Sequence, residues 1–188
     1  MGVKLAAASG GSIELVPTNT ASAFTVTVPA VTGTMLTNAT TTGFPAGSVL
    51  QVVQATYAVQ TTISTSTYTD TGLSASITPT SASSKILVFI SQSIQTQIAA
   101  NTDAITAFRI VRDSTAIHTM TRVNGIRAGT GDGTFVINVG YVTPIYLDSP
   151  STTSSVTYKS QFSMTSGANS IANSASTIST ITLMEIAA

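Results

Sequence analysis

The chain contains few side chains that could act as an acid, a base, a nucleophile or a metal ligand. His118 is its only histidine, and it has no cysteine. Without cysteine there is no disulfide, no thiolate metal site and no cysteine nucleophile. No Gly-x-Ser-x-Gly turn exposes a serine nucleophile. We therefore expect no catalytic residue, no metal site and no cofactor, and we interpret His118 as a structural or interface residue.

A glycine-rich segment, residues 129–134 (GTGDGT), superficially resembles a phosphate-binding or calcium-binding loop. It lacks the Lys-Ser/Thr ending of a phosphate loop and the several carboxylates of a calcium loop. It also leads into a predicted strand, whereas a phosphate loop leads into a helix. We therefore interpret the segment as a hairpin turn.

Acidic residues raise the question of glycan cleavage, which uses a pair of carboxyl groups. Asp103, Asp113 and Asp132 all fall at the ends of predicted strands, where aspartate commonly stabilises turns. The sequence gives no distances between them. A glycan depolymerase is therefore kept as an alternative function, less favoured than a non-enzymatic one.

Half of the charged residues fall in one stretch of the chain. Of 7 basic and 7 acidic residues, seven lie between positions 103 and 132. Within it, Arg109, Arg112, Arg122 and Arg127 are candidate interface or receptor-contact residues. Guanidinium groups pair well with carboxylates, either across a subunit interface or on anionic sugars of a cell surface. The alternative interpretation is a solvated or salt-bridged sheet edge.

The composition is that of a protein that associates. Only 7% of the 188 residues are charged, whereas a soluble domain commonly carries about 25%. There are 35 Thr and 25 Ser, and 43% of the residues are hydrophobic, with a mean hydropathy of +0.37, which excludes a disordered chain. Thr, Val and Ile suit pleated, half-buried surfaces. We expect an all-β building block of an assembly.

Some classes of partner are excluded by the same properties. A net charge of zero and a pI near 6.5 give no electrostatic reason to bind nucleic acid. No apolar run approaches the roughly 18 residues that a membrane helix needs. The first residues lack the apolar region of a signal peptide. We expect neither nucleic-acid binding nor membrane insertion.

The pattern of residues 44–188 predicts a succession of β-strands. Period-two alternation or dense β-branched runs place them near 48–57, 62–70, 73–78, 85–95, 104–112, 116–123, 134–147, 155–164 and 178–187. Turn residues separate them, for example at 70–72 (DTG) and 113–114 (DS). Strands of this number and spacing predict an antiparallel β-sandwich that resembles a jelly roll.

The last predicted strand carries apolar residues on both faces, which is typical of a central strand covered on both sides. One cover would be the opposing sheet and the other a neighbouring subunit. Glu185 falls within this strand, and an unpaired buried carboxylate is costly. We expect a Lys or Arg side chain, or solvent at the end of the sandwich, to receive it.

Residues 1–43 are predicted to be a separate anchoring and trimerisation segment. Two strand-like pieces, 12–16 and 24–28, are each followed by a proline, Pro17 and Pro29, which stops a strand from extending. Two short strands do not make a stable sheet alone. The segment therefore needs a partner, most simply its own copies. Residues 37–43 are interpreted as a linker.

Six sequence segments, spread over nearly the whole chain, occur in a specific order. They are 12–34 (SIELVPTNTASAFTVTVPAVTGT), 45–54 (PAGSVLQVVQ), 68–88 (YTDTGLSASITPTSASSKILV), 108–117 (FRIVRDSTAI), 147–158 (LDSPSTTSSVTY) and 179–186 (STITLMEI). Together they resemble the fibre-like virion structural proteins, of tail-fibre or capsid-decorating type, of tailed phages of marine bacteria and cyanobacteria.

The resemblance implies a virion structural role with a β-rich terminal domain, commonly trimeric, and it assigns no catalytic residue. We expect a non-enzymatic protein of the virion that presents its sandwich for host attachment, with a capsid-decorating or stabilising protein as the alternative. Its partners would be its own copies in a homotrimer, other virion proteins through residues 1–43, and a host-surface glycan.

The first testable prediction is homotrimerisation. Oligomers bury neutral and apolar surface that a monomer would have to solvate, and this chain has little charge with which to remain a monomer. Light scattering at micromolar concentration should give about three times the chain mass of 19.1 kDa. A stable monomer under these conditions would contradict the prediction.

Overall fold

The computed structural model describes residues 3–6, 12–15, 44–98, 103–126, 136–166 and 169–188. The chain divides into two units, Met1–Met35 and Leu36–Ala188. In the first unit β1 (Val3–Ala6) pairs antiparallel with β2 (Ser12–Leu15). The strand expected at 12–16 is thus confirmed. The strand expected at 24–28 and the linker expected at 37–43 lie outside the described residues, and the boundary at residue 44 stays a prediction.

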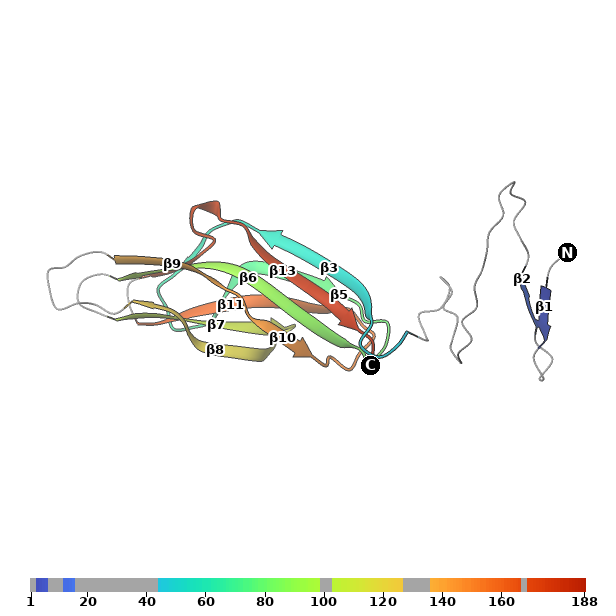
Figure 1. Cartoon of the computed structure of the whole chain (residues 1–188). Helices are drawn as coiled ribbons and strands as arrows, with labels where there is room; N and C mark the ends of the chain where they lie inside the picture. Colours follow the sequence, from blue (N-terminus) through green and yellow to red (C-terminus); the bar gives the residue numbers. More distant parts are fainter. Residues whose placement is uncertain (1–2, 7–11, 16–43, 99–102, 127–135, 167–168) are drawn as a thin grey trace, which may run out of the picture. The chain divides into compact units, whose positions relative to one another are not determined.

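The second unit is an antiparallel β-sandwich, as the sequence predicts (Figure 1). Sheet I consists of β3 (Val49–Tyr57), β4 (Thr61–Ile63), β6 (Lys85–Ile98), β9 (Val136–Val142), β10 (Ile145–Asp148), β12 (Asn169–Ala172) and β13 (Ser179–Ile186). Sheet II consists of β5 (Thr69–Ile77), β7 (Ala104–Arg112), β8 (Thr115–Ile126) and β11 (Val156–Ser166). A short 3-10 helix, η1 (Ser174–Ser176), precedes β13. Within these described parts no helix is long and apolar enough to span a membrane.

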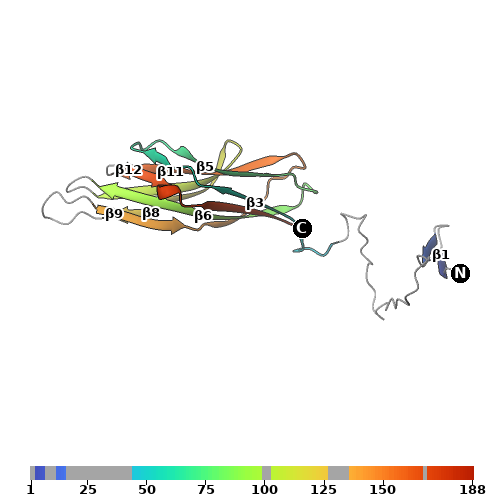
Figure 2. The same ribbon diagram turned by 90° about the horizontal axis from the view of Figure 1, so that it is seen from above.

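The strands of sheet I fall into four rows around β6. One edge of β6 pairs with β13 and then β12, and the other edge with β10 and then β9. β3 lies beyond β13, and β4 beyond β12. The eight rows of both sheets are numbered in chain order: β3 with β4, β5, β6, β7, β8, β9 with β10, β11, and β12 with β13. Their order in space is then 1-8-3-6 in sheet I and 2-7-4-5 in sheet II. This order of eight rows in two sheets is a jelly roll, and the rows run lengthwise along the domain (Figure 2).

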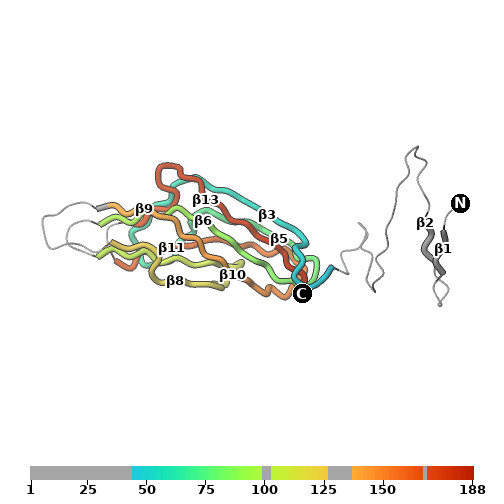
Figure 3. Tube along the Cα trace, in the orientation of Figure 1, coloured from blue at the N-terminus to red at the C-terminus, as the bar shows by residue number. Residues whose placement is uncertain are grey.

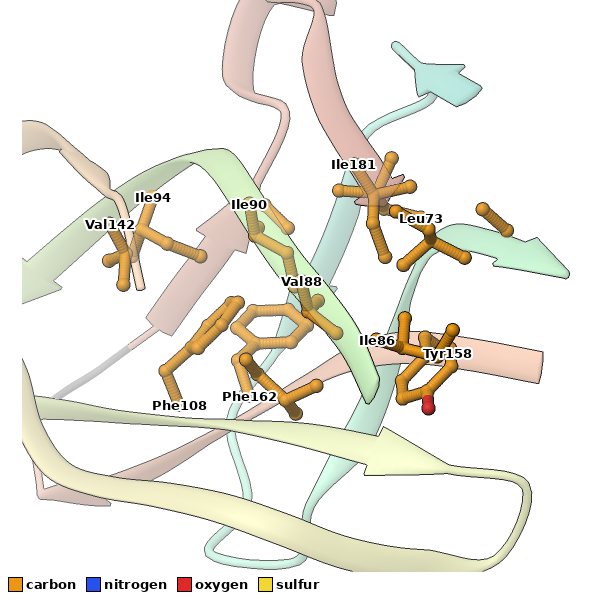
Figure 4. Packing of buried hydrophobic residues seen from close by; sticks show 14 of the residues in the cluster. Leu73, Ile86, Val88, Ile90, Ile94, Phe108, Val142, Tyr158, Phe162 and Ile181 are labelled. Atoms are coloured by element: carbon orange, nitrogen blue, oxygen red, sulfur yellow. The ribbon is translucent and has the colours of Figure 1, made fainter. Parts of the chain in front are cut away.

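The core lies between the two sheets and is built by alternation along the strands. On β6, Ile86, Val88 and Ile90 point inward and are buried. Phe108 of β7 and Phe162 of β11 meet them from sheet II (Figure 4). Because successive side chains of a strand point to opposite faces, a single row supplies both this core and an outer surface.

Polar side chains also occupy the core, and most of them are hydrogen-bonded to one another. Gln92 of β6 is fully buried; its Nε2 donates to Asn173 Oδ1 at 2.8 Å and to Ser179 Oγ at 2.9 Å. Its Oε1 accepts a hydrogen bond from Ser160 Oγ of β11 at 3.1 Å. Ser160 Oγ in turn lies 2.5 Å from Thr71 Oγ1 of β5. Buried hydroxyl and amide groups that are satisfied in this way link the two sheets and fix their register.

β13 is a central strand, as predicted, because it lies between β3 and β6. The expectation that a basic residue or solvent receives Glu185 is wrong. The Glu185 side chain is fully buried and accepts hydrogen bonds from Gln51 Nε2 at 2.6 Å and from the Thr80 backbone N–H at 2.7 Å. Burial alone would raise the pKa of Glu185, but these neutral donors outweigh it and hold the pKa below its usual value.

The turn expected at 70–72 is wrong, because β5 runs through these residues without a break. The pairing of β5 with β11 shifts register between Lys159 and Gln161, which is a β-bulge. Gly72 lies in the bulge with a φ of 92°, a conformation that favours glycine. The ring of Tyr57 packs where a Cβ of residue 72 would be. The strands expected at 62–70 and 73–78 are therefore replaced by the short β4 and the longer β5.

The strand expected at 134–147 is divided into β9 and β10. Pro144 stands between them and has no N–H to donate, although its carbonyl accepts a hydrogen bond from the Ile90 N–H at 3.1 Å. β12 is an additional strand that the sequence pattern did not predict. It is short and occupies the row of β13, from which Asn173 and η1 separate it.

Hydrogen bonds join the segment that leads into β3 to the segment that follows β13. The Gly47 N–H donates to the Ala187 carbonyl at 2.8 Å, and the Ala187 N–H donates to the Ser48 carbonyl at 2.9 Å. The tube in Figure 3 accordingly brings the start of β3 next to the C-terminus. The ladder between β3 and β13 is thus closed at the point where the chain enters and leaves the domain.

The bulge generates a stability prediction. Gly72→Ala should lower the free energy of unfolding by about 1–3 kcal/mol, because alanine at a positive φ is strained and its Cβ overlaps the Tyr57 ring. Gly140→Ala in β9 is the matched control; nothing lies within 4 Å of its added Cβ, so the change should stay within about 0.5 kcal/mol. Chemical denaturation measures both, and equal effects would show that the bulge has no special requirement.

Candidate functional site

The structure describes three of the four candidate arginines, and it does not bring these three together. Arg109 and Arg112 lie on β7 and Arg122 on β8, while Arg127 lies outside the described residues. β7 and β8 form a hairpin that turns at Asp113, so Arg112 is at the turn. Arg122 is seven residues beyond the start of β8, about 23 Å further along the strand. The three described arginines therefore have separate environments.

Arg112 belongs to a bridge between the two sheets. Its Nη1 donates to Asp148 Oδ2 of β10 at 2.7 Å, forming an ion pair. The same carboxylate oxygen accepts the hydroxyl of the buried Tyr158, also at 2.7 Å. Burial and the hydrogen bond to Asp148 raise the pKa of Tyr158 far above its usual value. Arg112 therefore has a structural role in the sandwich.

Arg109 lies on the outer face of sheet II, in a group that we call the outer polar cluster. Its members are Tyr68, Asp70, Arg109, Lys159 and Gln161. The Arg109 guanidinium carbon lies 4.1 Å from the centre of the Tyr68 ring, a cation–π contact. Its Nε donates to Gln161 Oε1 at 2.7 Å. The antiparallel pairing of β11 with β5 and β7 gathers these residues from three distant parts of the sequence.

The outer polar cluster is positively charged overall, with two cations and one anion. Lys159 Nζ pairs with Asp70 Oδ2 at 2.9 Å, and Gln161 Nε2 donates to Asp70 Oδ1 at 2.6 Å. Burial tends to raise the pKa of Asp70, but these hydrogen bonds and the positive charges of Lys159 and Arg109 lower it below its usual value. The cluster thus offers cationic and amide donors for an anionic or hydroxyl-rich ligand.

Arg122 is exposed and lines a half-open hollow of about 500 Å³ together with Asp103, Ala104, Ile105 and residues 123–126. The hollow lies at the end of the β7–β8 hairpin that is remote from its turn. Arg122 thus shares a site with Asp103, but not with Arg109 or Arg112. The hairpin turn expected at 129–134, together with Asp132, lies outside the described residues.

The other groups considered for chemistry have structural contacts. The His118 ring stacks on the Tyr146 ring with 5.2 Å between centroids, which joins β8 to β10. Asp113 lies in the β7–β8 turn, and its Oδ1 accepts the Thr157 N–H at 2.9 Å. Among the residues that the structure describes, no three His, Asp or Glu side chains gather as metal ligands would.

Sequence reasoning found Arg109 but missed the residues around it. Lys159 and Gln161 stand on the polar face of the strand predicted at 155–164, and that alternation was the available signal. Tyr68 and Asp70 carried no such signal, because 70–72 resembled a turn. Only the register of β11 against β5 and β7 places all five side chains on one surface.

No protein-family model and no curated protein sequence matches this chain. Solved structures with some similarity come from infectious bursal disease virus. The structure of its Gx strain is 16% identical, with 95% of this chain and 43% of that chain covered and a TM-score of 0.37. The crystal structure of its VP2 subviral particle is 13% identical, with 86% and 42% covered and a TM-score of 0.34. The chain spans less than half the length of these proteins, and at such TM-scores the similarity establishes no function.

Separate roles for the arginines predict separate effects on stability. Arg112→Ala should lower the free energy of unfolding by about 1–3 kcal/mol, because it removes the cationic partner of the mostly buried Asp148. Arg122→Ala, at an exposed position of the same hairpin, should change it by no more than about 0.5 kcal/mol. Thermal unfolding of both variants checks this. A neutral Arg112→Ala would contradict the structural role and return Arg112 to the candidates for receptor contact.

Proposed function

We propose that this protein is a non-enzymatic structural component of a virion, a fibre-like protein that presents its β-sandwich for attachment to a host surface. The observation that carries this proposal is that the chain has few charged residues and that several of them have structural roles. Asp148 and Glu185 are buried and hydrogen-bonded inside the sandwich, and Asp113 closes a turn. Only 7% of the residues are charged, against 35 Thr and 25 Ser, and this composition suits assembly and passive binding.

The outer polar cluster supports attachment to a surface glycan. It lies on the outer face of sheet II and keeps one excess positive charge. Arg109 and Lys159 can donate to a sugar carboxylate or sulfate, and charge-assisted hydrogen bonds of this kind are the stronger ones. Asp70 and Gln161 add groups that suit sugar hydroxyls.

Two alternatives use the same sandwich. A capsid-decorating protein would present an equally neutral surface to a shell, and would stabilise that shell without touching the host. A glycan depolymerase has less support, because the carboxylates of Asp148 and Glu185 are buried while Asp70 is held by Lys159 and Gln161. A catalytic pair would need two carboxyl groups facing one groove.

Attachment to other virion proteins is assigned to residues 1–43. The bonds between Gly47, Ser48 and Ala187 close the sandwich from within residues 44–188. A chain that begins at Phe44 keeps all of them, so it should fold. It would lack only the segment that joins it to the particle.

The prediction is tested on labelled virions. Antibody against the sandwich, imaged by electron microscopy on particles of the phage that encodes the protein, should label tail fibres. Label on the head instead would favour the decorating alternative, and absence of label from particles would contradict a virion role altogether.

Two controls sharpen this test. Particles grown with a chain beginning at Phe44 in place of the full chain should carry no label, although that shorter chain folds in solution. Incubation of the full chain with host-surface polysaccharide should release no new reducing ends, whereas release would favour the depolymerase.

A further inference from the structure

The outer face of sheet I carries an unusual concentration of exposed apolar side chains. Six large hydrophobic residues on this face are each 47–61% exposed. They are Val52, Ile137, Val139, Tyr141, Ile145 and Leu147. Residues 137, 139 and 141 alternate along β9, and 145 and 147 along β10, with the buried Val142 and half-buried Tyr146 on the inner side. The alternation thus gives the row of β9 and β10 a second apolar face, which is directed away from the core.

The apolar side chains are continuous across the rows of the sheet. Val52 of β3 pairs with Met184 of β13, Met184 with Leu87 of β6, and Leu87 with Leu147 of β10. In the same direction Phe89 pairs with Ile145. Cross-strand neighbours lie about 5 Å apart, so these side chains form an apolar band that crosses sheet I from β3 to β10. Beside β9 the neighbours on β6 are neutral and polar: Gln97, Gln95 and Ser93.

This surface is nearly free of charge. Among the described residues on the outer face of sheet I, Lys85 at the start of β6 carries the only charged side chain; Glu185 and Asp148 point inward. The outer face of sheet II, in contrast, carries Asp70, Arg109 and Lys159. The two outer faces of the sandwich therefore differ in kind, one suited to solvent and the other to burial.

The size of the face matches that of a protein interface. Four rows at about 4.8 Å each and a central strand of 14 residues at about 3.4 Å each give about 900 Å². A standard interface buries about 800 Å² per partner, so the face as a whole, with its neutral polar side chains included, is large enough for one. Apolar residues clustered on an exposed face commonly mark interaction sites.

We propose that the outer face of sheet I is the surface through which copies of this chain associate, so that each copy covers the apolar rows of another. This inference rests on the proposed function, in which the protein assembles with itself. A second copy is the occupant that fits. Lys85 is the only described charge on the face and is too little to select an oppositely charged partner, whereas the neutral Val, Leu, Ile, Thr and Gln side chains can pack against the same side chains of another copy.

The arrangement also orients the assembly. With sheet I covered by neighbouring copies, sheet II and its outer polar cluster face outward on every subunit. The surface proposed to bind a glycan is then presented in several copies, and multivalent presentation raises the avidity of weak sites.

The test places charge on one outer face or the other. Val139→Glu with Leu147→Glu should convert the oligomer to folded monomer, raising the dissociation constant by at least about 100-fold, because two carboxylates would be desolvated in an apolar contact. Ser74→Glu with Thr119→Glu, at exposed positions of sheet II, is the matched control and should leave the mass unchanged. Sedimentation equilibrium gives the mass, and thermal melts report whether each variant folds.

Cross-linking gives an independent readout that does not depend on disruption. The chain has no cysteine, so a single Val139→Cys provides the one thiol. A short bifunctional thiol reagent should join two copies of this variant, but not two copies of Ser74→Cys.

The outcomes separate this inference from the proposed function. An oligomeric chain whose mass survives the sheet I charges, or whose copies join through residue 74, overturns the assignment of the face while leaving the proposed function standing. A monomeric wild-type chain overturns the self-association itself. If the chain beginning at Phe44 associates where the full chain is monomeric, residues 1–43 occupy the face and a second copy does not.

Discussion

The backbone of β6 must be hydrogen-bonded along both edges for its 14 residues, because buried N–H and C=O groups left without partners are costly. This requirement organises the domain. One edge is satisfied by β13 and β12, the other by β10 and β9, and each of these strands takes its register from β6. That register sets three features of the domain. It brings Asp148 to Arg112, directs Glu185 into the interior and directs the apolar side chains of sheet I outward.

In this protein hydroxyl and amide side chains form many of the polar contacts that join the sheets, a role that charged pairs have in other proteins. Gln92, Ser160 and Thr71 join the sheets through the core. Gln51 and Thr80 satisfy the fully buried carboxylate of Glu185. Neutral groups cost less to bury than ions, so a sandwich stabilised in this way needs few charges. The small number of charged residues in the sequence therefore reflects how the interior is stabilised, as well as the nature of the surface.

The strand pattern was predictable from the sequence wherever it was continuous. The strand at 104–112 was predicted with its observed bounds, and the central position of β13 followed from its two apolar faces. The errors arose at local features that do not end a row. β5 runs through its bulge at Gly72, and the row of β9 and β10 continues past Pro144. At the site, nearness in sequence was misleading, because arginines along an extended hairpin separate, while Tyr68, Arg109 and Gln161 meet only through long-range pairing.

The closure of the ladder by Gly47, Ser48 and Ala187 has a consequence for the evolution of longer proteins. A domain whose entry and exit points are adjacent can be inserted into a host chain, or exchanged between chains, without disturbing the neighbours on either side. Residues 44–188 have this geometry. Recombination at these two points would keep the ladder between β3 and β13, and the sandwich that it closes, within one transferred segment.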